Sequence, residues 1–150
     1  MKITSLEEYG LRCLLQLART PQHQVVSVKE VAAKEGLSSA YVEKLLRILS
    51  RAGLVHSVRG VKGGYVMNRP ASSVTLGEVV RALGTVQTTK HICQHFTGNQ
   101  RVCVHFSDCG IRSIWSGLTT YIQSFLDQTT LESLLHPEYS VSEQLAKRMA

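Results

Sequence analysis

The stretch GLSSAYVEKLLRILSRAGLVHSVRGVKGGYVMN, residues 36–68, decides the fold. Ser38 or Ser39 can cap a helix there, because a serine side chain accepts a hydrogen bond from the free backbone N–H groups of the first turn. Two β-prone runs, LVHSV and YVM, then flank the glycine-rich basic turn RGVKGG. The stretch therefore predicts a helix followed by a β-hairpin. The apolar residues that recur at helical spacing before Gly53 are Val42, Leu45, Leu46 and Leu49.

A second, shorter helix precedes this stretch. In SVKE, residues 27–30, a serine followed three residues later by a glutamate forms a capping-box pattern, and the helix is expected to run to about Glu35. A short helix, a tight turn at EGLS, a second helix and a hairpin together constitute a winged helix-turn-helix. The sequence thus predicts a mainly α fold with a small β-hairpin wing.

Further helical segments surround this unit. Residues 5–19 show an amphipathic helical pattern, and TLGE, residues 75–78, is another capping box that opens a short helix. The tail after Pro137 is polar and is expected to be disordered. The chain divides into a winged helix-turn-helix domain at 1–84, a cysteine-bearing loop at 85–108, a long helix at 109–135 and a polar tail at 136–150.

Composition limits the class of protein. Of the 150 residues, 43% are hydrophobic, which is enough for the core of one domain, and no apolar run reaches the length of a membrane span. Acidic residues and an arginine interrupt the N-terminal segment, so it is not predicted to be a signal peptide. We expect a cytoplasmic protein with no membrane partner and no small-molecule substrate. An enzyme is not expected, because no nucleophile motif or phosphate-binding loop is found.

Positive charge is concentrated in the winged helix-turn-helix. The whole chain carries a net charge of +6, and residues 29–69, with eight basic and three acidic residues, account for +5. A basic segment favours a polyanionic partner, and a helix fits the major groove of double-stranded DNA. The alternatives are a solvated, slightly basic face, or a winged helix that binds another protein.

The expected DNA contacts come from the second helix and the wing. Small hydroxyl residues at the helix N-terminus allow a close approach, and the backbone N–H groups there favour phosphate. Glu43 can accept a hydrogen bond from a cytosine amino group; the alternative is a plain solvated glutamate. Arg59 and Lys62 at the wing tip can enter a minor groove or bind phosphates. The candidate DNA-binding residues are Ser38, Ser39, Tyr41, Glu43, Lys44, Arg59 and Lys62.

The long C-terminal helix carries an apolar stripe that includes Trp115 and Phe125. This surface is larger than a small domain can easily cover, so packing against the same helix of a second copy is expected. A homodimer of this kind would place two reading helices on two half-sites of a DNA operator. The alternative is that the helix folds back on its own domain.

Three of the four cysteines lie in one segment, at Cys93, Cys103 and Cys109. Clustered thiols in a reducing compartment favour metal binding or redox chemistry. The gaps between them are wider than the short paired gaps of structural zinc sites, which suits a bulkier group such as an iron–sulfur cluster. Cys109 is expected to begin the long helix. The fourth cysteine, Cys13, lies on an apolar helix face and is interpreted as a core residue.

Several motifs occur in an order that resembles one family. They are the opening MKITSLEEYGLRCLLQLAR, the helix GLSSAYVEKLLRILSRAGLV, the wing SVRGVKGGY, the following LGEVVRAL and the three-cysteine segment. Over about residues 1–130 the chain is similar to the Rrf2 family of bacterial transcription regulators, whose iron–sulfur members include IscR, NsrR and RirA. The resemblance implies a homodimeric winged-helix regulator, here expected to be a repressor. Its cluster would sense nitric oxide, iron, redox state or cluster supply and change DNA binding.

The resemblance also implies a set of ligands. The family's cysteine ligands fall on Cys93, Cys103 and Cys109. IscR-like members use a histidine three residues after the last cysteine, but that position holds Arg112, which cannot bind iron. NsrR-like members use a carboxylate in the first helix, reaching across from the other subunit, and that position holds Glu8. The chain is therefore closest to the carboxylate type, which implies a [4Fe–4S] cluster, with [2Fe–2S] as the other possibility.

Alternatives remain for the fourth ligand and for the chemistry of the thiols. His91, His95 and His105 are rival fourth ligands. If Glu8 is the ligand, its bond is the one expected to break on signalling, because oxygen is a weaker ligand for iron than thiolate. Its loss would loosen the contact between the first helix and the partner's cluster loop and bias a two-state dimer. Two regulators without a cluster are the alternatives, namely a cysteine thiol switch or a zinc-containing winged helix.

Overall fold

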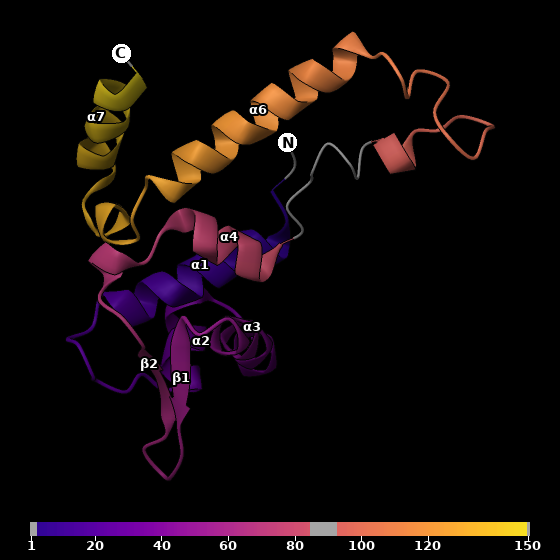
Figure 1. Ribbon diagram of the computed structural model, residues 1–150. Coiled ribbons are helices and arrows are strands. Elements are labelled where there is room, and N and C mark those ends of the chain that lie inside the picture. Colours follow the sequence, from indigo (N-terminus) through magenta and orange to yellow (C-terminus); the bar gives the residue numbers. More distant parts are fainter. Residues whose placement is uncertain (1–2, 85–92, 150) are drawn as a thin grey trace.

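The computed structural model in Figure 1 describes residues 3–84 and 93–149. The described chain is mainly helical, with one antiparallel hairpin, and this confirms the predicted fold class. A further helical turn occupies residues 93–95. The elements are α1 (Ser5–Ala18), α2 (Val28–Glu35), α3 (Ser39–Arg51), β1 (Val55–Val58), β2 (Gly64–Met67), the 3-10 turn η1 (Ala71–Ser73), α4 (Leu76–Leu83), α6 (Gly110–Asp127), the 3-10 turn η2 (Glu132–Leu135) and α7 (Glu138–Met149).

Side-chain caps determine where the helices of the N-terminal body begin. α4 starts with the predicted complete capping box, in which Thr75 and Glu78 satisfy each other's backbone N–H groups. At α2 the predicted box is only half formed. The Ser27 hydroxyl accepts from the Glu30 backbone N–H at 3.1 Å, but the Glu30 carboxylate turns away to accept from Lys34 Nζ at 2.8 Å. An i,i+4 ion pair has therefore replaced the return bond of the box.

The core lies between α1, α3 and α4, with α2 and the hairpin packed against its edges. Each fully buried leucine contributes about 1.5–3 kcal/mol through removal of apolar surface from water. Cys13 is completely buried among these side chains, as predicted. Burial raises the pKa of the Cys13 thiol to about 11, with a smaller effect from Glu35. The buried residues of the three helices include Leu14, Leu17, Leu45, Leu46, Leu49, Val79 and Leu83.

The wing is attached to the body at its base. β1 and β2 pair in a register that runs from Val55 opposite Met67 to Val58 opposite Gly64. Tyr65 also pairs with Val26 through two backbone hydrogen bonds of 2.9 and 3.0 Å, so β2 is bonded on both sides. The turn between the strands has no such support, and it projects away from the body (Figure 1).

The long helix is shorter than predicted. We expected a helix through residue 135, but α6 ends at Asp127 and the chain then turns back to the body. Thr129 accepts a hydrogen bond from the Leu76 N–H at 2.8 Å, and the Leu131 N–H donates to Val74 at 2.8 Å. Leu131 is completely buried. The apolar residues after Asp127 therefore complete the core of the N-terminal domain and do not extend the helical stripe.

The two ends of α6 have different surroundings. Its C-terminal end packs on α4, where Arg81 Nη1 and Asp127 Oδ1 form an ion pair at 2.8 Å. Its N-terminal half extends away from the body (Figure 1). The fold-back alternative thus holds for one end of the helix only. The exposed apolar side chains of the other part are Ile111, Ile114, Trp115, Leu118 and Tyr121.

The C-terminal tail is helical, and the expectation of disorder is wrong for residues 138–149. α7 spans Glu138–Met149 and stands beside the C-terminal end of α6 (Figure 1). Its side chains are mostly exposed, with Val141 and Leu145 half-buried one turn apart. Within the described ranges, no helix combines the length and the apolar character needed to cross a membrane.

Candidate DNA-binding surface and cysteine loop

Helix α3 presents one face to the core and the other to solvent. Its N-cap is Ser38, whose hydroxyl accepts from the Tyr41 backbone N–H at 3.2 Å. Ser38 and Ser39 are both exposed, so the N-terminus of the helix is accessible. α3 and the wing lie on the side of α1 opposite to α6 (Figure 1). The structure therefore brings the candidate residues of α3 and of the wing to the same part of the molecule.

The solvent-facing side of α3 carries an ion pair. Glu43 Oε1 accepts from Arg47 Nη2 at 2.6 Å, one helical turn away. This hydrogen bond, followed by the charge of Glu43, raises the pKa of Arg47 above its usual value. A shallow groove runs beside the pair and is lined by Ala40, Glu43, Lys44, Arg47, Ile48 and Arg51.

Sequence reasoning missed two cations of this surface, Arg47 and Arg51. Both are exposed on the same side of α3 as the candidate residues Glu43 and Lys44. The signal was present in the sequence, because Arg47 stands four residues after Glu43 and Arg51 four residues after Arg47. Residues four apart lie on one face of a helix.

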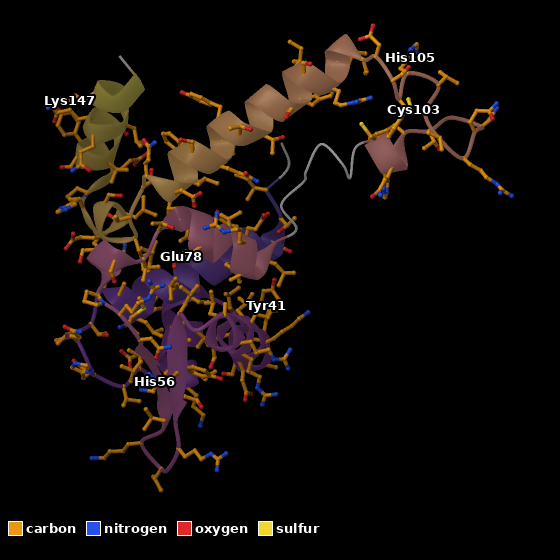
Figure 2. The ribbon with its side chains drawn as sticks, viewed as in Figure 1. Tyr41, His56, Glu78, Cys103, His105 and Lys147 are labelled. Atoms are coloured by element: carbon orange, nitrogen blue, oxygen red, sulfur yellow. The ribbon has the colours of Figure 1, made fainter. Side chains whose placement is uncertain are left out.

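Tyr41 has a packing role in addition to any contact with DNA. Its ring is half-buried against the core and meets the ring of Tyr9 edge to face, with the ring centres 6.0 Å apart. Figure 2 labels Tyr41 on α3 close to the body. The contact joins the start of α3 to α1, so Tyr41 helps to set the position of the helix.

The wing tip is a small basic turn. Arg59 and Lys62 are both exposed there, as is Val61 between them. The Gly63 N–H donates to the Gly60 carbonyl at 2.9 Å and closes the turn. Gly60 has a φ of 118°, which residues with a side chain rarely adopt. The turn therefore holds its two exposed cations at the tip of the hairpin.

Glu8 lies in the first turn of α1 and is exposed. The nearby Arg12 bonds to another carboxylate: its Nε donates to Glu35 Oε2 at 2.6 Å, and its guanidinium lies 5.4 Å from the centre of the Tyr9 ring. Glu8 is thus accessible to another molecule. It does not lie in a group of metal-binding side chains within the described part of the chain.

The three clustered cysteines lie on the loop before α6. Cys93 belongs to the helical turn 93–95, Cys103 starts a tight turn, and Cys109 is the N-cap of α6. All three are half-buried and free of disulfide bonds. Figure 2 shows Cys103 and His105 on this loop, at the end of α6 that is distant from the body. Between residues 93 and 149, as between 3 and 84, no three His, Cys, Asp or Glu side chains are grouped to hold a metal ion.

Two of the three histidines that compete as fourth ligands lie within the described residues. His95 and His105 are both exposed on the cysteine loop. His91 lies outside the described residues. Arg112, which cannot bind iron, contacts the loop through its guanidinium.

A winged helix-turn-helix with a basic, accessible second helix is typical of a DNA-binding transcriptional regulator. Comparison with known proteins gives the family. The model of the Rrf2 family, described as iron-dependent transcriptional regulators, matches residues 3–137. The chain belongs to the Rrf2 family, and the resemblance predicted from the sequence is confirmed.

Characterised relatives support this membership. The protein Rrf2 of Nitratidesulfovibrio vulgaris is 33% identical over 135 residues, which cover 90% of this chain and 87% of the relative. The structure of IscR from T. potens is similar with a TM-score of 0.70 and 30% identity, over 90% of this chain and 86% of that one. CymR, described as the global cysteine regulator of B. subtilis, is similar with a TM-score of 0.71 and 31% identity, over 90% and 96%.

Proposed function

We propose that this protein is a homodimeric repressor that binds a DNA operator and senses its signal through an iron–sulfur cluster. The observation that carries the proposal is the group of three free cysteines on one loop, Cys93, Cys103 and Cys109, at the end of α6. The family description, iron-dependent transcriptional regulator, agrees with it. The signal would be nitric oxide, iron, redox state or cluster supply.

The chemistry of the donor set fits an iron–sulfur cluster. Thiolates are the ligands that hold such clusters, and the three thiols are only half-buried and so can reach a bound group. They are not grouped as a metal site, so we expect the segment around Cys93 to move toward Cys103 and Cys109 on binding. Once bound, the cluster would supply a redox-active iron centre at the end of α6.

Glu8 of a second copy is the proposed fourth ligand, which favours a [4Fe–4S] cluster over [2Fe–2S]. Its carboxylate is exposed on α1 and accessible to another chain. The exposed His95 and His105 are the competing donors on the loop itself. Glu8→Ala should therefore make cluster loss faster and blunt the response to the signal. An unchanged response would transfer the role to a histidine.

DNA recognition is assigned to α3 and the wing. The exposed N-terminus of α3 approaches phosphates through Ser38 and Ser39, and Tyr41, Glu43 and Lys44 follow in its first turns. Arg59 and Lys62 at the wing tip would contact the neighbouring minor groove or its phosphates. The distance between two such surfaces in a dimer would set the spacing of the operator half-sites.

The first experiment is an anaerobic purification with an absorption spectrum and assays of iron and sulfide. About four irons and four sulfides per chain would support a [4Fe–4S] sensor, and about two of each would support [2Fe–2S]. Cys103→Ala should lose the iron, whereas Cys13→Ala should keep it because Cys13 lies in the core. A colourless protein that still binds DNA would refute the cluster and leave the winged helix-turn-helix intact.

A thiol switch without a cluster is the second candidate. Two observations favour it: the three loop cysteines are free, and the structure resembles CymR, the global cysteine regulator of B. subtilis. Oxidation of one loop thiol to a sulfenic acid, followed by attack of a second thiol with loss of water, would form a disulfide. In that case mild peroxide would change DNA binding in iron-free protein. A zinc-containing regulator would be identified by zinc in the metal assay.

A further inference from the structure

Arg112 connects the cysteine loop to the long helix. It lies in the first turn of α6, where its backbone N–H donates to the carbonyl of Cys109 at 3.2 Å. Its Nη2 donates to the carbonyls of His105 at 3.1 Å and Phe106 at 2.5 Å. The guanidinium carbon also lies 5.6 Å from the centre of the Phe106 ring. One side chain thus makes three contacts with a two-residue segment of the loop.

That segment carries the turn of the second cysteine. The Phe106 N–H donates to the carbonyl of Cys103 at 3.0 Å, which closes a turn from Cys103 to Phe106. Arg112 holds this turn, while Cys109 is the N-cap of the helix that carries Arg112. The position of Cys103 relative to Cys109 therefore depends on the Arg112 side chain.

Arg112 also carries a further donor, its Nε–H. Its Nε is inaccessible to solvent and has no hydrogen-bond partner among the described residues. A buried N–H without an acceptor is unfavourable, and native proteins seldom leave one unpaired. An anionic sulfur between the loop thiols would be a suitable acceptor, because charge-assisted hydrogen bonds are the strong ones.

We propose that Arg112 is a positioning residue of the cysteine loop, which holds the Cys103 turn against α6 and donates its Nε–H to a sulfur atom of the bound cluster or its thiolates. The proposal rests on the cluster-binding function proposed above. Groups that hydrogen-bond to the sulfurs of a metal site commonly change its stability and potential.

Two variants separate the two contributions of the side chain. Arg112→Ala removes both the carbonyl contacts and the Nε–H. Arg112→Lys keeps a cation that can donate to the carbonyls of residues 105 and 106 but lacks the Nε–H. Arg101→Ala is the matched control, because it removes an exposed arginine from the same loop. Hydrogen–deuterium exchange of residues 103–109 in the iron-free protein reports the first contribution. The rate of iron loss to a ferrous chelator, and the midpoint potential, report the second in reconstituted protein.

We expect Arg112→Ala to speed exchange of the loop and to release iron faster by on the order of tenfold or more. Arg112→Lys should restore loop protection but still release iron faster, and it should lower the midpoint potential because a donor to sulfur is lost. Arg101→Ala should match the unmodified protein. The inference would be overturned if the loop of Arg112→Ala exchanged at the same rate as that of the unmodified protein. It would also be overturned if Arg112→Lys showed the same rate of iron loss and the same midpoint potential as the unmodified protein. Failure of the unmodified protein to bind iron would instead refute the cluster, and the exchange experiment would still test the contact with the loop.

Discussion

Glu43 and Arg47 bind each other in the structure and are also placed to contact DNA. The pair is exposed, with 46% and 65% of the respective side chains accessible, so water and ions compete with it. Surface ion pairs of this kind contribute little to stability. The pair can therefore open when DNA approaches, which would free the carboxylate for a base and the guanidinium for a phosphate.

Replacement of Glu43 should change specificity more than affinity. We expect Glu43→Ala to relax base preference, because the acceptor for a cytosine amino group is lost, and to change affinity for random DNA less. Selection from a pool of random duplexes measures the first effect, and titration with a random-sequence duplex measures the second. Glu30→Ala is the control, since Glu30 forms the same i,i+4 pair with Lys34 on α2. Equal effects on both measurements would reduce Glu43 to a solvated surface residue.

Gly64 allows a close approach of backbone to backbone. An added Cβ would lie 2.2 Å from the Val26 carbonyl oxygen, which cannot move without breaking the pairing of residues 26 and 65. We expect Gly64→Ala to lower the free energy of unfolding by about 1–3 kcal/mol. Urea denaturation at fixed protein concentration measures this loss of stability.

The control for this prediction is Gly117→Ala, where an added methyl group on α6 meets no other atom. In a helix that change should raise stability by about 0.5–1 kcal/mol. An unchanged midpoint in Gly64→Ala would show that the segment around Val26 can move aside.

Residue-level features were predictable where one local rule decides them. The Ser38 cap and the Thr75–Glu78 box follow from side-chain chemistry, and the sequence analysis predicted both. α1 has a second complete box, formed by Thr4 and Glu7, which the same sequence pattern indicates although it was not among the predicted caps. The buried Nε of Arg112 could not have been predicted, because it depends on where a loop lies.

At the scale of elements, the wing should bind DNA phosphates through its positive charges and should contribute little to the recognition of bases. We expect Arg59→Ala to weaken binding to specific and random DNA alike. The slope of log affinity against log salt should fall by about one, because one phosphate contact is lost. Lys147→Ala removes the same charge from α7, on the far side of the molecule (Figure 2), and should have no effect. Binding unaltered across the salt series would remove the wing from the DNA-binding surface.

The first turn of α4 should make stability sensitive to acid. The pKa of Glu78 is lowered, first by the Thr75 backbone N–H and then by the hydrogen bond from Arg69. A carboxylate whose pKa is lower in the folded state than its ordinary value of 4.5 stabilises the fold at pH values above 4.5. This contribution is lost as the pH falls through the lower pKa of the folded state. Glu78→Gln should thus be less stable than the unmodified protein at pH 7.

The difference in free energy of unfolding between Glu78→Gln and the unmodified protein should become smaller as the pH falls. Urea denaturation of both proteins at pH 7 and at successively lower pH measures the effect. Thr75→Ser keeps the capping hydroxyl and should retain the acid sensitivity of the unmodified protein. A gap between the two proteins that stays constant with pH would contradict the assignment to Glu78.

The predicted elements were those with strong periodicity or clear turn residues. The helices of the winged helix-turn-helix and the hairpin fall in this class. α7 was missed because its apolar positions are few, with Val141, Leu145 and Met149 four residues apart among mostly polar residues. The helix predicted over residues 109–135 was too long because Leu131 and Leu134 continue the apolar pattern of α6, although both side chains pack on the core of the N-terminal domain. Periodicity indicates that a residue is buried, but it does not indicate which surface buries it.

At the scale of the whole molecule, the exposed stripe of α6 should mediate dimerisation. Ile114 is 68% exposed, and Ile111, Trp115 and Leu118 lie on the same face. Ile114→Glu should convert a dimer into a monomer, because a charge would be buried at the interface. Light scattering after size exclusion measures the mass. Thr120→Glu is the control, since Thr120 lies just over half a turn from Leu118 and so faces the opposite side. A monomeric unmodified protein would contradict the prediction.

The larger arrangement could be predicted only in part. The order of motifs indicated the family and the winged helix-turn-helix, because each motif is a contiguous run of residues. The pairing of residues 129–131 with residues 74–76 joins segments that share no sequence signal. The ligand set of the cysteine loop is a prediction that depends on a second chain and a bound group. The sequence therefore indicates which residues are available but not how they converge.

The attachment of α6 has a mechanical consequence. The helix has 18 residues and is therefore about 27 Å long, fixed at Asp127 and free at Cys109. Its fixed end packs on α4, beside the ion pair between Arg81 and Asp127, and is followed by the buried Leu131. By that length, a tilt of about 10° at the fixed end carries the cysteine end through about 5 Å. In a dimer the same tilt would change the reach from the loop to Glu8 of the other chain. The position of the cysteine loop can thus be set by packing at a point that lies a full helix length from it.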